Sequence, residues 1–155
     1  GGFQIFSLEG MRKLSEEGVE FRSHLDGAKC FLTPELAIGI QEELGVDIAM
    51  VLDECPAGDR QFADVEQSLA MTNRWARRCL AARTNPATSV FGITQGGIFR
   101  ELRTRAAEDL GALPFDGMAI GGLSVGESKE HMYEVLSYHP EQLPAHKIRY
   151  LMGVG

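Results

Sequence analysis

The sequence predicts an α/β fold in which parallel strands are connected by helices. Short, continuously apolar segments alternate with amphipathic segments of helical period, as expected for buried parallel strands joined by right-handed crossovers. A doubly wound sheet and a β/α barrel both fit this pattern. A glycine-rich or polar loop follows each apolar segment, and this favours the barrel, whose active sites lie at the carboxyl ends of the strands. We therefore expect part of a (β/α)8, TIM-like barrel with about four core parallel strands and an N-terminal hairpin insertion.

The N-terminal part of the chain is expected to form that hairpin insertion. Residues 3–8 predict an extended segment, and residues 11–17 predict helical turns. Residues 19–25 and 29–32 alternate in polarity on either side of Asp26-Gly27, and this arrangement is a strong hairpin signal.

The next elements are a helix, a strand and a long helix. The first helix is predicted to begin at residues 33–35, because Thr can cap, Pro suits the first helical position and an early acid suits the helix dipole. Gly45 is expected to end it. Residues 46–52 predict a strand that is buried on both faces. Residues 64–67 resemble a capping box and are expected to begin a helix that runs to about Arg83.

The remainder of the chain repeats the same unit. Three further strands are predicted at residues 89–94, 116–120 and 148–152. Amphipathic helices are expected at 98–110 and after the cap Ser128, with Pro140 beyond the end of the second one.

Composition and charge limit the classes of function. The 155 residues are 44% hydrophobic and 24% charged, which is ordinary for a globular domain. No apolar stretch is long enough to span a bilayer, so we expect no membrane partner. The net charge of −7 gives no nucleic-acid signal. Arg74, Arg77 and Arg78 on the long helix are expected to form a solvated face, with a phosphate-contacting patch as the alternative.

The 3 cysteines are odd in number, far apart and in no C-x-x-C pattern. This favours a reducing, cytoplasmic setting and argues against a disulfide framework or a metal site in this chain. Cys55 has no nearby histidine in the sequence, so it is predicted to line a pocket rather than to act as a nucleophile.

Three consecutive predicted strands end in polar groups that suit a flat heterocycle. They deliver Asp53, Gln95 and the segment 121–123 to the same rim of the fold. A carboxylate can accept two adjacent N–H groups, a carboxamide offers a donor and an acceptor, and glycines let a ligand approach the backbone closely. This set suits a base such as guanine. Asp53 as an ordinary cap, glycines that serve only turns, and a phosphate-binding rim of a sugar-phosphate enzyme remain alternatives.

Six strings, in order along the whole chain, resemble the tRNA-guanine transglycosylase family. They are Gly1-Gly2-Phe3-Gln4, Phe31-Leu32-Thr33-Pro34-Glu35, Asp53-Glu54-Cys55, Gly92-Ile93-Thr94-Gln95-Gly96-Gly97, Ala119-Ile120-Gly121-Gly122-Leu123-Ser124-Val125-Gly126-Glu127 and Tyr150-Leu151-Met152-Gly153-Val154-Gly155. The resemblance implies a barrel enzyme that exchanges guanine at the tRNA wobble position for a 7-deazaguanine base. It also implies a covalent intermediate between RNA and an enzyme aspartate.

The resemblance implies roles for residues of this chain at the base. Asp53 would read the N–H edge, Gln95 and the Gly122 N–H the carbonyl, and the Leu123 carbonyl an exocyclic aminomethyl group. Val125 would favour the smaller 7-aminomethyl-7-deazaguanine over bulkier bases. The other implied contacts are substrate-binding Gly1 and Gly2, Phe3 and Met152 on the ring faces, Cys55 in the pocket wall, and RNA-binding Gly153, Val154 and Gly155.

Three features of the family are not found in these residues. The general-base aspartate would precede Gly1, the nucleophilic aspartate would follow Gly155, and a cysteine-rich segment that holds one structural zinc would lie farther downstream. We therefore expect a central, inactive fragment of a bacterial enzyme that is a homodimer at full length. The alternatives are an archaeal-type deazaguanine transglycosylase, a non-catalytic tRNA-binding partner subunit and a sugar-phosphate barrel enzyme.

Overall fold

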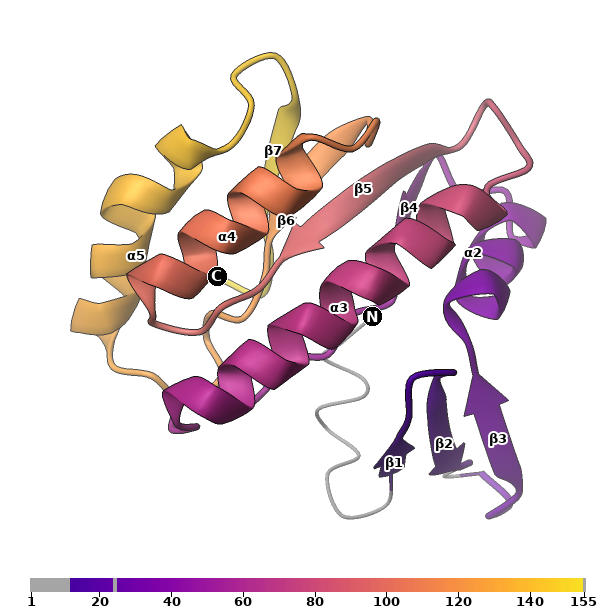
Figure 1. Ribbon diagram of the computed structural model, residues 1–155. Coiled ribbons are helices and arrows are strands. Elements are labelled where there is room, and N and C mark those ends of the chain that lie inside the picture. The colour runs from indigo at the N-terminus through magenta and orange to yellow at the C-terminus, as the bar shows by residue number, and fades with distance from the viewer. Residues whose placement is uncertain (1–11, 24, 155) are drawn as a thin grey trace.

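The computed structural model describes residues 12–23 and 25–154, which form two sheets and the helices around them (Figure 1). One sheet is antiparallel, with strand order β1-β2-β3, and the other is parallel, with order β4-β5-β6-β7. The extended segment predicted at residues 3–8 lies outside the described residues.

The small sheet contains the predicted hairpin. Its strands are β1 (Arg12–Leu14), β2 (Val19–Arg22) and β3 (Lys29–Leu32). The hairpin between β2 and β3 is confirmed, and Phe21 pairs with Cys30. The helical turns predicted at residues 11–17 are wrong for the part that the structure describes. Leu14 instead pairs with Val19 across a tight turn, because Ser15 donates its N–H to the Gly18 carbonyl at 3.0 Å.

The first helix, α2 (Pro34–Glu43), begins as predicted. The Thr33 hydroxyl accepts the Leu36 N–H at 3.1 Å, and Pro34 occupies the first turn. The helix leads into β4 (Ile48–Met50), which was expected to be buried on both faces. β4 instead forms an edge of the sheet among the described residues, and Ile48 is 50% exposed.

The long helix α3 (Phe62–Ala82) begins earlier than the predicted capping box. Gln61 is the capping residue, without a side-chain hydrogen bond, so Asp64 lies in the first turn. Asp64 donates its own N–H to the Gln61 carbonyl at 3.1 Å, so it cannot be the residue before the helix. The face of α3 that packs on the core includes the buried residues Val65, Leu69, Thr72 and Ala76.

Arginines of α3 connect the helix to the N-terminal part of the chain. Arg74 forms a two-point ion pair with Glu16, with both N–O distances at 2.8 Å. Arg78 pairs with Glu35 at 2.7 Å and also donates to the Glu16 carbonyl. These contacts engage both guanidinium groups within the protein, which weakens the alternative of a phosphate-contacting patch.

The remaining elements follow the predicted order along the chain. They are β5 (Ser89–Thr94), α4 (Arg100–Gly111), β6 (Gly117–Ile120), α5 (Lys129–Gln142) and β7 (Ile148–Leu151). Ser128 caps α5 as predicted, but Pro140 lies inside the last turn of that helix rather than beyond it. Proline has no N–H, so one helical hydrogen bond is absent at this position, but the turn after it still closes because Leu143 donates its N–H to the Pro140 carbonyl at 3.3 Å.

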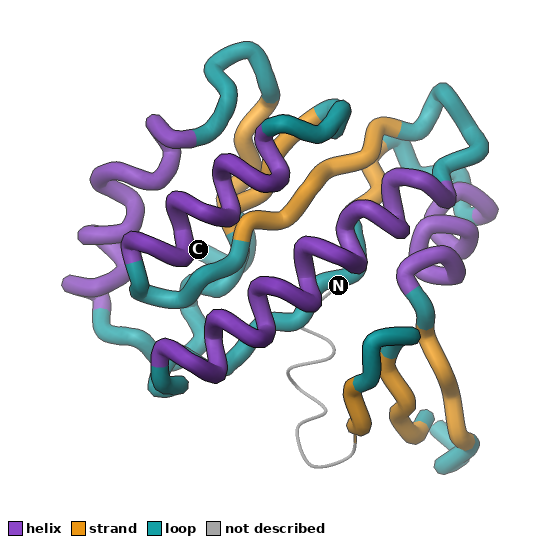
Figure 2. Tube along the Cα trace, viewed as in Figure 1, coloured by secondary structure: helices purple, strands orange, loops and turns teal. Residues whose placement is uncertain are grey.

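The parallel sheet has the order of a barrel rather than that of a doubly wound sheet. Each of its strands pairs with the next one in the chain, so the strand order never reverses. The helices α3, α4 and α5 lie side by side along the same face of the sheet (Figures 1 and 2). Sequential parallel strands with one outer layer of helices form an arc of a (β/α)8 barrel. The fold class predicted from the sequence is therefore confirmed.

The core lies between this arc of strands and its helices. Its largest buried side chains include Trp75 of α3 and Met118 of β6. No helix in residues 12–23 and 25–154 is long and apolar enough to cross a membrane. The carboxyl ends of all four parallel strands meet at one rim, and the polar residues singled out in the sequence follow directly from them.

Candidate functional site

The strand-end loops enclose a small cavity of about 90 Å³. Its walls come from the chain after β4, β5, β6 and β7, so the cavity lies where active sites of β/α barrels lie. The residues that line it are Asp53, Cys55, Gln95, Gly121, Gly122, Leu123, Val125, Met152 and Gly153. The structure thus brings together most of the site residues expected from the sequence. The expected residues Gly1, Gly2, Phe3 and Gly155 lie outside the described part of the chain.

Asp53 and Gln95 form a buried pair at the base of the cavity. The Gln95 Nε2 donates to the Asp53 Oδ2 at 2.7 Å, and the two residues are 2% and 1% exposed. Asp53 and Gln95 both line the cavity, and a carboxylate oxygen can accept more than one hydrogen bond. The Gln95 Oε1 is buried without a hydrogen-bond partner within the described residues. A buried carboxylate and amide side by side match a ligand edge with both donors and an acceptor.

Helix α3 holds the segment around Asp53 from the outside. The Cys79 thiol accepts the Leu52 N–H at 3.3 Å. The Thr72 hydroxyl accepts the Glu54 N–H at 3.0 Å, so both neighbours of Asp53 are fixed to one helix. This arrangement explains how a short edge strand can present its terminal carboxylate in a defined direction.

Cys55 lines the cavity but is a poor nucleophile. Burial raises the pKa of its thiol to about 11, and the negative charge of Asp53 adds to the rise. The reactive form of cysteine is the thiolate, which is scarce at neutral pH at such a pKa. This environment fits the predicted role of Cys55 as part of the pocket wall.

The glycine pair after β6 is required by two separate constraints. Gly122 has a φ of +66°, a left-handed conformation that side chains disfavour. A Cβ at Gly122 would also collide with the Gln95 Oε1. At Gly121, a Cβ would lie 2.7 Å from the Ile93 Cγ2 and 2.9 Å from the Gln95 Nε2. The two glycines therefore make room for the Gln95 amide, and they do more than form a turn.

The loop after Gly122 is shaped by Glu127, which the sequence analysis did not single out. Its carboxylate accepts the backbone N–H groups of Ser124 and Val125, the second at 2.9 Å. In a trans peptide the C=O points opposite to the N–H. The Ser124 N–H faces Glu127, so the Leu123 carbonyl is directed away from that carboxylate. This oxygen lies 4.0 Å from the position of a Cβ at Gly153, across the cavity.

The end of β7 closes the other side of the cavity. Met152 donates its N–H to the Ile120 carbonyl at 3.1 Å, which keeps the chain parallel to β6 beyond the strand. Gly153 then turns with a φ of +68° and leads to the half-buried Val154. Met152 lines the cavity, and its role on a ring face, which the resemblance implies, stays a prediction. Phe3, the other residue expected there, lies outside the described residues.

Arg103 supports the site from behind, and the sequence did not predict this role. This side chain of α4 is 0% exposed and reaches behind the strand ends. It donates to the Gly97 and Gly121 carbonyls at 2.7 Å and to the Gly122 carbonyl at 3.0 Å. In the sequence it stands between apolar positions of an amphipathic helix, where a charged residue beside Leu102 was the available signal.

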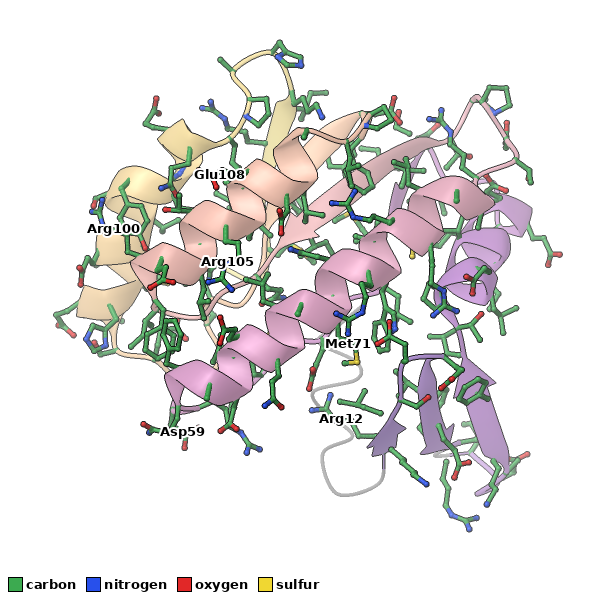
Figure 3. All side chains as sticks on the ribbon, viewed as in Figure 1. Arg12, Asp59, Met71, Arg100, Arg105 and Glu108 are labelled. Atoms are coloured by element: carbon green, nitrogen blue, oxygen red, sulfur yellow. The ribbon has the colours of Figure 1, made fainter. Side chains whose placement is uncertain are left out.

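A second cavity lies between β1, α3 and the segment that follows Asp53. It measures about 720 Å³, and Arg12 and Met71 are among its lining residues (Figure 3). Glu54 is among the residues that line this larger cavity, but Asp53 and Gln95 are not. Although it is larger, it lacks the buried donor and acceptor pair, so the smaller cavity is the better candidate site.

Within residues 12–23 and 25–154, no group of three or more His, Cys, Asp and Glu side chains is placed to hold a metal ion. Cys55 and Cys79 are buried free thiols and Cys30 is half-buried. The described residues therefore do not fit the structural zinc that the family resemblance implies for the whole protein.

Comparison with known proteins decides between the families that share this architecture. The sequence model of the family described as Queuine tRNA-ribosyltransferase matches residues 1–155. The chain belongs to this family. Bacterial relatives named queuine tRNA-ribosyltransferase are 55% identical over 156 residues in Ruminiclostridium cellulolyticum, 54% over 156 in Enterococcus faecalis and 56% over 161 in Oleidesulfovibrio alaskensis.

These alignments cover 100% of the chain but 42%, 41% and 42% of the three relatives. The chain thus spans about two fifths of the length of the queuine tRNA-ribosyltransferases it matches. Family membership supports the resemblance inferred from the sequence strings, and it places the strand-end cavity within a family of tRNA-modifying enzymes.

Proposed function

We propose that this chain is the base-recognition part of an enzyme that exchanges guanine at the tRNA wobble position for 7-aminomethyl-7-deazaguanine. The observation that carries the proposal is the buried Asp53–Gln95 pair, which faces the Gly122 backbone in a cavity at the strand ends. A guanine-type base needs acceptors for an N–H and an amino group, and donors for a carbonyl. Because the chain belongs to a family of queuine tRNA-ribosyltransferases, we take a guanine-type base as the ligand of Asp53, Gln95 and the Gly122 backbone.

Each group of the cavity has a distinct role in this proposal. The Asp53 carboxylate accepts the two N–H groups on one edge of the base. The second N–H of the Gln95 amide and the Gly122 N–H donate to the base carbonyl. The Leu123 carbonyl accepts the exocyclic aminomethyl group, and Met152 lies on a face of the ring. The fused ring thus meets complementary groups around its polar edge.

The bond-breaking step is assigned to parts of the whole protein other than these residues. The family resemblance implies an aspartate before residue 1 that serves as general base and another after residue 155 that attacks the ribose. The attack would expel guanine and form a covalent intermediate, which the incoming base would resolve. Within this chain, Asp53 therefore holds and orients the base, and Gly153 and Val154 begin the segment that approaches RNA.

Val125 supports the smaller incoming base. Val125 lines the same cavity as Leu123, whose carbonyl is proposed to meet the substituent of the base. A branched side chain there leaves less room than the glycine expected for enzymes that use the bulkier queuine. The three relatives compared with this chain are bacterial, which agrees with this choice over an archaeal-type enzyme.

The cavity gives less support to a partner subunit or to a sugar-phosphate enzyme. A non-catalytic partner subunit has no need to keep a buried carboxylate and amide in register. A sugar-phosphate enzyme needs a cation beside the ligand, whereas the described lining of the cavity contains no lysine or arginine. Arg103 lies behind the glycines, and its donors are already bound to carbonyl oxygens.

The remaining expectations concern the whole protein. We propose a cytoplasmic homodimer with one structural zinc outside this chain. The free cysteines of the described residues agree with a reducing compartment. The expected polymeric substrate of the whole protein is tRNA.

Replacement of Asp53 tests the proposal in the full-length protein. In Asp53→Asn, one acceptor becomes a donor, so incorporation of labelled guanine into tRNA should fall at least about 100-fold with two charge-assisted hydrogen bonds weakened. Binding of tRNA in a gel-shift assay should persist. Asp59→Asn is the matched control, because Asp59 is an exposed aspartate of the same loop (Figure 3). Guanine incorporation in Asp53→Asn equal to that of this control would refute the assignment.

A further inference from the structure

Arg103 places a charged group in the interior behind the candidate site. Its side chain arises from α4 and is completely buried. The hydrogen-bond acceptors of its guanidinium group in the described structure are backbone carbonyl oxygens: Gly97 at 2.7 Å, Gly121 at 2.7 Å, Gly122 at 3.0 Å and Thr94 at 3.3 Å. These carbonyls belong to the ends of β5 and β6 and the loops after them.

Burying the charged guanidinium carries a desolvation penalty that a surface ion pair does not, so the position of Arg103 calls for a specific explanation. Burial lowers the pKa of the Arg103 guanidinium to about 10, so the group remains charged at neutral pH. A neutral side chain could fill the same volume without the desolvation penalty. Arg105 on the same helix shows the ordinary arrangement, since it pairs with Glu66 at 2.7 Å and Glu101 at 3.1 Å and is 43% exposed (Figure 3).

The geometry of the peptide bond gives Arg103 a directional effect on the cavity. The Gly121 carbonyl and the Gly122 N–H belong to the same peptide unit, and in a trans unit they point in opposite directions. The chain contains no cis peptide bond among its described residues. With the carbonyl bound to Arg103, the Gly122 N–H is turned away from α4 and towards the cavity that Gly122 lines.

The same contact makes that N–H a stronger donor. The positive charge of Arg103, hydrogen-bonded to the Gly121 carbonyl oxygen, draws electron density through the peptide unit and increases the positive partial charge of the Gly122 N–H. Low polarity around the buried group preserves this effect. Glycine at both positions would otherwise allow the peptide to rotate, so an external constraint is needed to fix its orientation.

We propose that Arg103 is a positioning residue that orients and polarises the Gly121–Gly122 peptide for the carbonyl oxygen of the base. The inference rests on the proposed function, because it assumes that a guanine-type base occupies the cavity. It assigns part of the selectivity for a carbonyl-bearing base to a side chain that does not touch the base. The alternative role is a structural brace that joins α4 to the strand ends.

A pair of ligands distinguishes positioning from bracing in the full-length protein. Guanine and 6-thioguanine present the same N–H edge to Asp53, but sulfur is a weak acceptor for the Gly122 N–H. The test is a calorimetric measurement of the affinity of both bases for the wild type, Arg103→Lys and the control Arg105→Lys. Lysine keeps the charge but cannot span several carbonyls with a rigid fork. The preference for guanine over 6-thioguanine should fall about 5- to 10-fold in Arg103→Lys and stay unchanged in Arg105→Lys.

The outcomes separate this inference from the proposed function. Equal weakening of both bases in Arg103→Lys would overturn the positioning role, since a loosened brace affects both ligands alike. If Arg103→Lys does not fold, Arg103→Gln provides the same comparison; failure of both variants to fold would assign Arg103 to the fold itself and overturn the proposal. A wild-type protein that binds neither base would overturn the proposed function as well.

Discussion

Substitution of Gly122 tests how closely the glycine pair and the Asp53–Gln95 pair depend on each other. In Gly122→Ala, the alanine must adopt a φ of +66°, and its Cβ collides with the Gln95 Oε1. To relieve the collision, the Gln95 amide must move away from Asp53, to which it donates at 2.7 Å. The substitution should therefore cost both stability and affinity for the base.

A matched control separates the backbone cost of Gly122→Ala from the cost of disturbing the Gln95–Asp53 hydrogen bond. Gly45 has a φ of +69°, and a Cβ there would meet nothing within 4 Å, so Gly45→Ala carries the backbone cost alone. That cost is about 1–2 kcal/mol. Gly122→Ala should add about 1.5–3 kcal/mol for the weakened buried hydrogen bond to the Asp53 carboxylate. The difference between the two variants then reports the interaction of Gly122 with Gln95.

The assay combines urea unfolding with base incorporation in the full-length protein. The urea midpoint of Gly122→Ala should lie below that of Gly45→Ala, and its KM for guanine should rise at least about 10-fold, as expected when one charge-assisted hydrogen bond is lost. Gly45→Ala should keep the wild-type KM. Equal midpoints together with an unchanged KM in Gly122→Ala would refute the packing argument.

Two further predictions address base size and the N-terminal contacts. Val125→Gly should enlarge the space beside the Leu123 carbonyl, so a 7-deazaguanine with a bulkier substituent should react faster relative to the small base; an unchanged ratio of kcat/KM would contradict the size argument. Arg78→Met should destabilise the protein relative to Arg77→Met above about pH 4.5, as measured by urea unfolding. The Arg78 contact lowers the pKa of Glu35 to about 2, so this stabilisation is complete above the unfolded-state pKa near 4.5 and is lost as the pH falls through about 2; a pH-independent difference would contradict it.

The order of elements and the rim of the site could be predicted from sequence because they depend on local patterns. Apolar segments that end in Asp53, Gln95 and Gly121 predicted both the parallel strands and the meeting of these residues at one edge. The starts of helices were predictable where a side chain caps the backbone, as at Thr33 and Ser128. They were mispredicted at Asp64, because Gln61 begins α3 without a side-chain hydrogen bond.

The supporting contacts of the site could not be predicted because they join segments that are distant in the sequence. The four carbonyls bound by Arg103 come from two strand ends and their loops, and helical periodicity says nothing about which carbonyls a buried arginine will meet. The register that places Thr72 beside Glu54 likewise depends on how α3 packs on the sheet. Glu127 follows a glycine-rich loop, and its capping of Ser124 and Val125 depends on the left-handed φ of 59° at Ser124.

The central claim is that Asp53 and Gln95 read the polar edge of a deazaguanine base. A crystal structure of the full-length protein with 7-aminomethyl-7-deazaguanine tests it most directly. We predict that the N–H edge of the base lies on the Asp53 carboxylate, and that the base carbonyl accepts hydrogen bonds from Gln95 and from the Gly122 N–H. A base bound away from Asp53, or bound in this cavity with its carbonyl turned from Gly122, would contradict the account.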